Sequence, residues 1–440
     1  MRVAMVMPMS PESAIADVMT QAVPELSQHW DLEVWCPTEA NYRPCPVPVI
    51  PYDAPGQDVL DALASHDLAV YVLGNSPWHS RILPLAQRLP GLTVLHDASL
   101  TDLVRHTAIE TKELDLLVRH VEAHFGFEDA DILRAAGTAL VTPERWLRFC
   151  AEVPLVDVAL RGSLGVVVHS RWHARQVEGL TLGDVTVAPL PVPSTRLGFD
   201  NNQSGRASRL LGKLPDDAVL LVTVGAVNAN RGIDLLLEAI ADDEALGAVH
   251  LWAVGPAEDN VRIDLLTRAR ALGLSERFAV TGRVTDGLLQ EILSRAEISA
   301  ALRDPVLEGQ SASVLTQLLS GTPVIVYDHA HYAELPDDVV LKVPLMDKVG
   351  GIRAALHRMV ADDIERTRRG ARGRDYVLNS RSGAAYATAL LAAGDRALSA
   401  LPRAHMTADL GERLRRLGLH KEPAVLEAAT DLAFDLFDLA

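Results

Sequence analysis

The sequence predicts an α/β protein built from two doubly wound, Rossmann-like domains with a cleft between them. Short apolar runs alternate along the chain with stretches whose apolar residues recur at helical spacing. This alternation is typical of parallel sheets that are covered by helices on both faces. It stops at residues 189–208, which contain three prolines, and then starts again. The 440 residues of the chain are enough for two to three domains of roughly 150 residues each.

The first predicted domain covers residues 1–195. Its strands are expected at 2–7, 32–36, 47–50, 68–73, 92–95, 164–169 and 185–188, where short apolar runs occur. Its helices are expected at 13–28, 77–88 and 171–178, with a mainly helical block at about 100–151. In the stretch 13–28, Ile15, Val18, Met19 and Ala22 recur at steps of three to four residues and predict one buried face.

The second predicted domain covers residues 205–375 and repeats the pattern. Its strands are expected at 218–224, 249–254, 278–281, 298–302, 324–327 and 339–343. Its helices are expected at 232–240, 261–272, 288–295 and 311–319. Residues 376–440 are expected to form helices that pack back on the domains. In such an arrangement the carboxyl ends of the parallel strands face the cleft, where α/β folds bind their ligands.

Composition narrows the range of partners and locations. The chain has 41 Lys and Arg against 58 Asp and Glu, a net charge of −17, so a nucleic acid is not expected as the main partner. Three cysteines in a chain of this length do not suggest a disulfide framework. No apolar run approaches the roughly 18 residues of a transmembrane helix, and the apolar start is too short for a signal peptide. We therefore expect a cytoplasmic protein with no transmembrane segment.

The loop after the strand at 218–224 has the composition of an anion site. It contains Gly225, Asn228 and Arg231 and leads directly into a predicted helix. A cation at a helix N-terminus opposes the helix dipole, and a bound diphosphate would reverse the sign of that interaction. An arginine in solvent on an ordinary turn explains these residues equally well.

A second polar loop follows the strand at 298–302. Glu308 could accept hydrogen bonds from sugar hydroxyls, Gly309 would permit close approach of a ligand, and Ser311 fits a helix N-cap. An acidic residue before a helix also stabilises that helix without any ligand, and these residues alone favour this simpler explanation. His96 ends the strand at 92–95 and could face the cleft, although a single histidine there is more often structural.

Motifs of several other enzyme classes are missing from the sequence. No Cys/His cluster has metal-ligand spacing. The sequence has no GxSxG elbow and no Walker A loop. No GxGxxG follows the first strand, which weakens the case for a dinucleotide dehydrogenase.

Taken together, these segments resemble family 4 of the retaining glycosyltransferases, which has the GT-B fold. The resemblance covers roughly residues 1–395. It rests on ordered signals at 8–17, 166–170, 187–192, 225–231, 255–256, 308–309 and 321–325. It implies transfer of a sugar, with retention of configuration, from a nucleotide diphosphate sugar to an acceptor hydroxyl. The acceptor is a small molecule, a lipid-linked molecule or a glycan. No cofactor, metal or protein nucleophile is then required.

The resemblance assigns roles to individual residues. Arg231 would bind the diphosphate, and Glu308 and His96 would contact the donor sugar. The other residues placed at the donor are Gly225, Asn228, Gly309, Gln310, Ser311 and Thr316.

The chain departs from the family pattern at three positions. Thr316 stands where the family has a second Glu that bonds the ribose, Ala226 where a second Arg is common, and Ala14 where a Gly is usual. Arg303 is a candidate for part of the missing positive charge. These departures motivate one alternative, a catalytically degenerate homologue that acts as a partner subunit. A nucleotide-sugar 2-epimerase on the same fold is a second alternative, although no carboxylate pair in the sequence favours it. The sequence does not give the sugar, the base, the acceptor or the oligomeric state.

Overall fold

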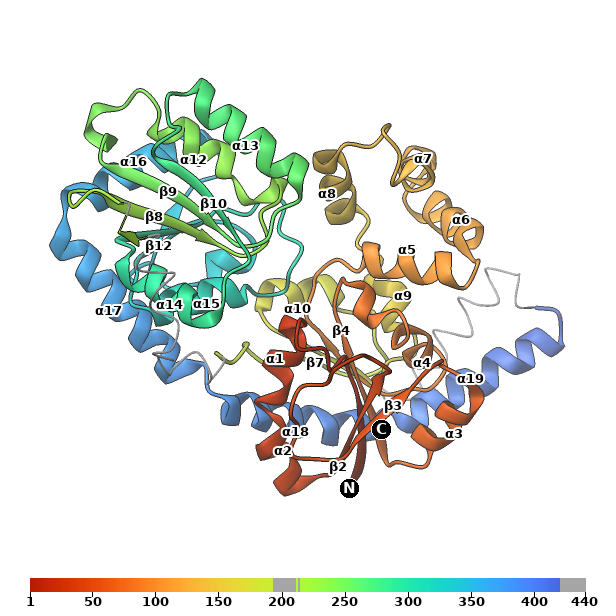
Figure 1. Ribbon diagram of the computed structural model, residues 1–440. Helices are drawn as coiled ribbons and strands as arrows, with labels where there is room; N and C mark the ends of the chain where they lie inside the picture. The colour runs from red at the N-terminus through yellow and green to blue at the C-terminus, as the bar shows by residue number, and fades with distance from the viewer. Residues whose placement is uncertain (193–210, 213, 420–440) are drawn as a thin grey trace.

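The computed structural model describes residues 1–192, 211–212 and 214–419, and it confirms the predicted fold class of two parallel-sheet α/β domains (Figure 1). The first sheet has the strand order β3-β2-β1-β4-β5-β6-β7. Its strands are β1 (Arg2–Val6), β2 (Asp31–Pro37), β3 (Val49–Tyr52), β4 (Leu68–Leu73), β5 (Leu92–Leu95), β6 (Gly165–Val168) and β7 (Val185–Val187). All neighbouring strands run parallel, and the chain switches direction across the sheet between β1 and β4.

The second sheet has the order β10-β9-β8-β11-β12-β13, again with parallel neighbours. Its strands are β8 (Val219–Val224), β9 (Val249–Val254), β10 (Phe278–Gly282), β11 (Ile298–Ala301), β12 (Val324–Tyr327) and β13 (Val340–Val343). The switch point of this sheet lies between β8 and β11. In an open α/β sheet, ligands bind outside the carboxyl ends of the strands at such a point.

Helices cover both sheets. The first domain has α1 (Ala14–Thr20), α2 (Val23–His29), α3 (Gln57–Ala64), η1 (Pro77–His79), α4 (Leu83–Ala86), α5 (Thr101–Glu110), α6 (Leu114–His124), α7 (Phe127–Ala135), α8 (Pro143–Glu152), α9 (Val156–Leu160) and α10 (Arg171–Val177). The second has η4 (Ala229–Arg231), α12 (Ile233–Ile240), η5 (Glu244–Leu246), α13 (Asp259–Ala271), α14 (Asp286–Arg295), α15 (Ala312–Leu319), η6 (Ala330–Glu334) and α16 (Lys348–Ala361).

Two predicted helices differ in detail from the structure. The stretch 13–28 forms two helices, α1 and α2, because Pro24 lies in the first turn of α2 and cannot continue a preceding helix. The stretch 77–88 forms only the short η1 and α4. The helix α3 was not predicted.

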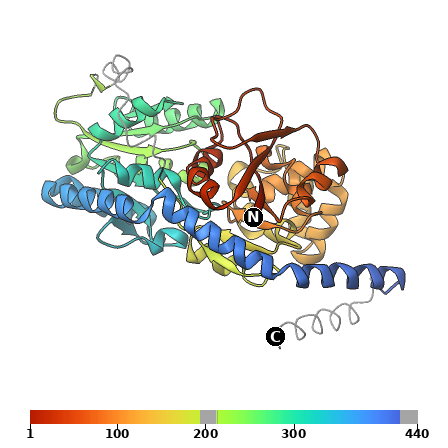
Figure 2. The ribbon, with the colours of Figure 1, turned by 90° about the horizontal axis from the view of Figure 1, so that it is seen from below.

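The last helices cross from the second domain to the first, as Figure 2 shows for the blue part of the chain. They are α17 (Asp363–Ser380), α18 (Gly383–Ser399) and α19 (Leu401–Arg416). α17 packs against α15, whereas α18 packs against α2 and the first sheet, where Tyr386 and Leu390 join the core. α17 runs across the boundary predicted at residue 375. Most of the predicted linker (193–208) and residues 420–440 lie outside the described residues. Within the described part, no helix is both long enough and apolar enough to span a bilayer.

The two passages of the chain between the domains are bonded to each other. The N–H of Val192, where the chain leaves the first domain, donates to the carbonyl oxygen of Arg381 (3.0 Å). Arg381 lies between α17 and α18, where the chain returns.

Candidate active site

The carboxyl ends of the two sheets meet through two loops. One loop follows β5 and the other follows β11. The N–H of Ala98 donates to the carbonyl oxygen of Leu307 (2.8 Å), and the N–H of Gly309 donates to that of His96 (2.9 Å). Asp97 and Glu308 thereby form a short antiparallel bridge between the domains. The residues predicted at the cleft are therefore packed against each other here.

Glu308 is the centre of a buried charged cluster. Its carboxylate lies 2.7 Å from Nη1 of Arg303 and accepts a hydrogen bond from the hydroxyl of Tyr332 (2.9 Å). Nε2 of His331 lies 3.7 Å away. Burial by itself would raise the pKa of Glu308, but Arg303, His331 and Arg231 outweigh it and hold that pKa well below its usual range. Glu308 is therefore ionised, and the structure brings it close to Arg231, as a shared site requires.

Arg231 is a buried cation without a carboxylate partner among the described residues. It is 5% exposed, and its Nη1 donates to the carbonyl oxygen of Val224 (2.9 Å) while its Nε has no partner. Burial, assisted by Arg303 and only partly opposed by Glu308, lowers the pKa of Arg231 to about 9. Such a charge is costly to bury without a counter-ion. An anionic ligand would supply one.

Gly225 makes the position of this guanidinium possible. A Cβ at Gly225 would lie 2.3 Å from Nη2 of Arg231, and the backbone there has φ +119°, which favours glycine. Asn228 precedes η4, and its side chain is exposed. Both residues therefore belong to the loop that holds Arg231. Gly225 lies against the guanidinium, and Asn228 lies on the protein surface.

The protonation of His96 follows from its neighbours. Nδ1 of His169 lies 2.9 Å from the carbonyl oxygen of Ala188, and Nε2 of His169 lies 3.1 Å from Nδ1 of His96. Because a carbonyl can only accept, His169 donates from Nδ1, so His96 must donate from its own Nδ1. Burial, and then the neighbouring histidines, lower the pKa of His96, so it is neutral. Its Nε2 is a buried acceptor without a partner among the described residues, and it suits a hydroxyl donor.

Gly309 brings the two domains together. A Cβ there would lie 2.2 Å from Nδ1 of His173 and 3.0 Å from the carbonyl oxygen of His96. We expected Gly309 to permit close approach of a ligand. In the structure, the absence of a side chain at Gly309 permits close approach of His173 and His96 of the first domain. The amide of Gly309, which the resemblance places near the donor, bonds His96 in this structure.

Gln310 faces the connection between the domains. Its Oε1 accepts from the N–H of Leu190 (2.8 Å) and from Nη1 of Arg381 (3.2 Å). The side chain therefore contacts both passages of the chain between the domains.

Ser311 and Thr316 bond within α15. The hydroxyl of Ser311 accepts from the N–H of Val314 (3.4 Å) and so caps the helix as expected. The hydroxyl of Thr316 donates to the carbonyl oxygen of Ala312 (3.0 Å). Thr316 is buried, so its donor is engaged by the helix itself.

Sequence reasoning missed Asp97, which joins this cluster from the first domain. Its Oδ2 accepts from the N–H of Asn75 (2.6 Å). Burial, opposed by that N–H and assisted by Glu308, raises the pKa of Asp97 to about 7. The available signal was its position directly after β5 and His96. His169, His173 and Tyr332 carried no comparable signal.

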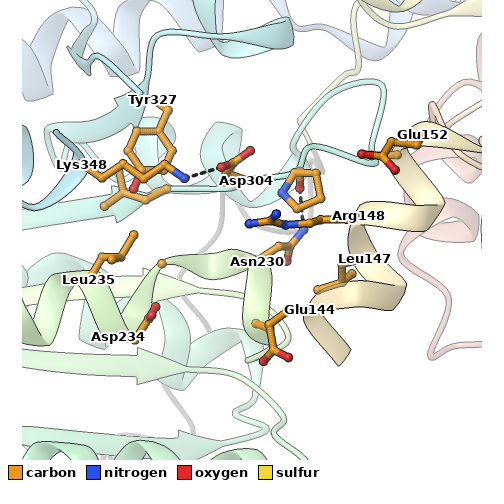
Figure 3. Close-up of a pocket in the computed structure, with 15 residues that line it drawn as sticks. Glu144, Leu147, Arg148, Glu152, Asn230, Asp234, Leu235, Asp304, Tyr327 and Lys348 are labelled. Atoms are coloured by element: carbon orange, nitrogen blue, oxygen red, sulfur yellow. Dashed lines mark hydrogen bonds and ion pairs between the residues drawn. The ribbon is translucent and has the colours of Figure 1, made fainter. Parts of the chain in front are cut away.

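A pocket of about 470 Å³ lies beside this cluster, between α8 of the first domain and the carboxyl edge of the second sheet (Figure 3). None of the predicted site residues lines it. The lining includes Asn230 and Asp304, which are the chain neighbours of Arg231 and Arg303. Nδ2 of Asn230 donates to the carbonyl oxygen of Pro305 (2.9 Å), and the N–H of Asp304 donates to the carbonyl oxygen of Asn230 (3.0 Å). Over the described ranges, no three His, Cys, Asp or Glu residues are grouped as a metal site.

Comparison with known proteins agrees with this architecture. Residues 218–362 match the family described as glycosyl transferases group 1, so the match covers most of the second domain. A search of curated proteins finds no match.

Solved structures match nearly the whole chain at low identity. WaaG, a glycosyltransferase involved in lipopolysaccharide biosynthesis, is 14% identical with a TM-score of 0.59, over 90% of this chain and 99% of its own. Sucrose-phosphate synthase from Thermosynechococcus elongatus is 16% identical with a TM-score of 0.60, over 88% and 97%. HepE from Anabaena, in complex with UDP and glucose, is 12% identical with a TM-score of 0.60, over 89% and 98%. At these identities the likeness shows a common fold. The chain therefore has the GT-B fold, and its residues 218–362 match the glycosyl transferases group 1 family.

Proposed function

We propose that the protein is a retaining glycosyltransferase, similar to family 4, that takes its sugar from a nucleotide diphosphate sugar. The observation that carries this proposal is the buried guanidinium of Arg231, which forms no ion pair with a carboxylate among the described residues; the charge of Glu308 only partly offsets its burial. It lies in the loop between β8 and α12, inside the group 1 domain. A diphosphate bound there would neutralise the charge and accept charge-assisted hydrogen bonds.

The neighbouring groups fit the sugar end of such a donor. Ionised Glu308 accepts hydrogen bonds, and Nε2 of His96 is an acceptor still open to a sugar hydroxyl. Arg303 and Arg231 carry the positive charge that a leaving diphosphate needs, so we propose that no metal ion is required. The three cysteines are unpaired, which fits the cytoplasmic location that we also propose.

In this proposal the reaction proceeds on one face of the sugar. The bond between the anomeric carbon and the diphosphate oxygen breaks as the acceptor oxygen bonds to the same face of that carbon. The electron pair leaves with the nucleoside diphosphate, whose phosphate oxygen takes the proton of the acceptor hydroxyl. Arg231 stabilises the developing charge, and no protein nucleophile takes part.

Calorimetric titration tests the donor site. UDP, GDP, dTDP and ADP are titrated without metal and then with Mg²⁺, beginning with UDP because HepE was solved with it. We expect one nucleotide to bind selectively without Mg²⁺. We expect Arg231→Ala to weaken it by about 10- to 100-fold, the usual effect of hydrogen bonds to a charged group.

The matched control is Arg270→Ala, which removes an exposed arginine of α13 in the same domain. Equal nucleotide affinity in wild type and Arg231→Ala would remove Arg231 from the diphosphate site. Absence of binding by all four nucleotides would favour a non-catalytic partner subunit.

A further inference from the structure

The pocket between the domains is lined by residues other than those of the proposed donor site. Residues 144, 147, 148, 151 and 152 of α8 line one side, and the loop at η4, the ends of β11 and β12 and the start of α16 line the other. Figure 3 shows the side chains of α8 facing those of the second domain across this space. Neither Arg231 nor Glu308 is among the residues that line it.

Two buried polar groups in the lining have no partner. The hydroxyl of Tyr327 belongs to a residue that is 0% exposed, and Oδ1 of Asn230 to one that is 4% exposed. Neither atom has a hydrogen-bond partner among the described residues. Buried polar atoms without partners are rare in native proteins. Both atoms can accept from a ligand hydroxyl, and the hydroxyl of Tyr327 can also donate.

The lining also carries an excess of negative charge. It contains the carboxylates of Glu144, Glu152, Asp234 and Asp304 against two cations, Arg148 and Lys348. Lys348 is already paired with Asp304 and lies over the ring of Tyr327. The carboxylate of Asp234, half-buried at the start of α12, has no charged partner among the described residues.

We propose that this pocket binds a polyhydroxylated small molecule that carries an ammonium group, such as an amino sugar. The ammonium group pairs with Asp234, and hydroxyl groups bond Tyr327 and Asn230. Since the lining comes from both domains, the ligand contacts α8 and the second sheet together. This site does not depend on the proposed transferase activity.

Ligand-observed NMR titration at pH 7 with glucosamine, glucose and glucuronate tests this proposal, because these probes differ mainly in charge. We expect glucosamine to bind about tenfold or more tightly than glucose, and glucuronate not to bind. Tyr327→Phe should weaken glucosamine by about three- to tenfold, the effect of one hydrogen bond. Asp234→Asn should abolish the preference for glucosamine over glucose.

Two controls match these variants. Tyr71→Phe removes another buried hydroxyl without a partner, from the first sheet. Asp286→Asn removes another carboxylate from the first turn of a helix, α14. We expect both to bind glucosamine like wild type.

Several results would overturn the proposal. One is failure of glucosamine to bind wild type at millimolar concentration, and another is binding of glucuronate as tight as that of glucosamine. A third is an equal loss of affinity for glucosamine in Tyr327→Phe and Tyr71→Phe. The fourth is that Asp234→Asn still binds glucosamine more tightly than glucose. UDP titrations of the same variants keep the two sites apart. Tyr327→Phe is expected to bind UDP like wild type, so failure at one site leaves the other testable.

Discussion

Replacing Arg231 by methionine should stabilise the protein without nucleotide and weaken nucleotide binding. Methionine has a similar length and no charge, so it keeps the packing under Gly225 and removes the buried cation. Burial lowers the pKa of Arg231 well below its ordinary value, to about 9, and each pKa unit corresponds to about 1.4 kcal/mol. Burial of this charge therefore costs on the order of 5 kcal/mol.

Part of that gain is lost again in the variant. The carbonyl of Val224 loses its donor, which costs about 1–3 kcal/mol. A net gain of about 2–4 kcal/mol remains, and this raises Tm by about 4–16 °C for a unit of 150–250 residues. The stability gained by Arg231→Met depends on pH. The folded protein binds this proton less tightly than the unfolded chain, so the penalty is complete at pH 7 and disappears as pH rises above about 9.

Differential scanning calorimetry at pH 7.5, with and without UDP, checks this expectation. Wild type should gain more in Tm from UDP than Arg231→Met, although the variant should unfold at the higher temperature without UDP. Arg270→Met is the control for removal of an arginine and should change neither value by more than about 1 °C. A lower Tm for Arg231→Met without UDP would refute the reasoning that this cation is buried at a cost.

Three further outcomes follow from the same region. Glu308→Gln should reduce sugar transfer by at least about 100-fold and leave nucleotide affinity nearly unchanged. It should also lower the free energy of unfolding by about 3–5 kcal/mol, because Arg303 loses its buried partner. Wild-type turnover would exclude Glu308 from the site. Gly309→Ala should lower the free energy of unfolding, measured in urea, by about 1–3 kcal/mol. His173→Ala should relieve part of that loss, since the new Cβ would lie 2.2 Å from the imidazole of His173, while the carbonyl oxygen of His96 at 3.0 Å stays in place. Fully additive losses in the double variant would contradict this contact. Burial lowers the pKa of His173 to about 3, whereas the unfolded chain protonates near 6.5, so its contribution to stability is complete above about pH 6.5 and is lost toward pH 3. His173→Leu should flatten that part of the stability profile and His405→Leu, at an exposed position on α19, should not.

The strands were predictable because buried parallel strands are continuous apolar runs, as in β4, which is buried at all six positions. The break between α1 and α2 was missed because the apolar spacing continues through Pro24. The loops of Arg231 and Glu308 were predictable because each follows a strand and precedes a helix. The residues that these loops contact could not be predicted. His169 lies 73 residues from His96 in sequence, and no local pattern encodes a contact over that separation.

The hydrogen-bond partners and contacts of individual side chains could not be predicted from the sequence either. A hydroxyl at position 316 looks the same in the sequence whether it faces a ribose or bonds its own helix, as Thr316 does. The sequence likewise gives no sign that the space between Gly309 and the first domain is too small for a Cβ atom. The bond of Thr316 depends on the rotamer of its side chain within α15, and the contact of Gly309 depends on how the second domain is rotated against the first.

The bond between Val192 and Arg381 restricts that rotation. Since both passages of the chain meet at this bond, a rotation of one domain against the other leaves the bond intact when its axis passes through this point. Gln310 bonds to both passages, so its loop lies at the axis and is displaced least. α8 lies on the far side of the interface from the α17–α18 junction (Figure 1), where the same rotation produces the largest movement. The pocket at α8 should therefore change its width with the angle between the domains, while the loop around Gln310 keeps its place at every angle.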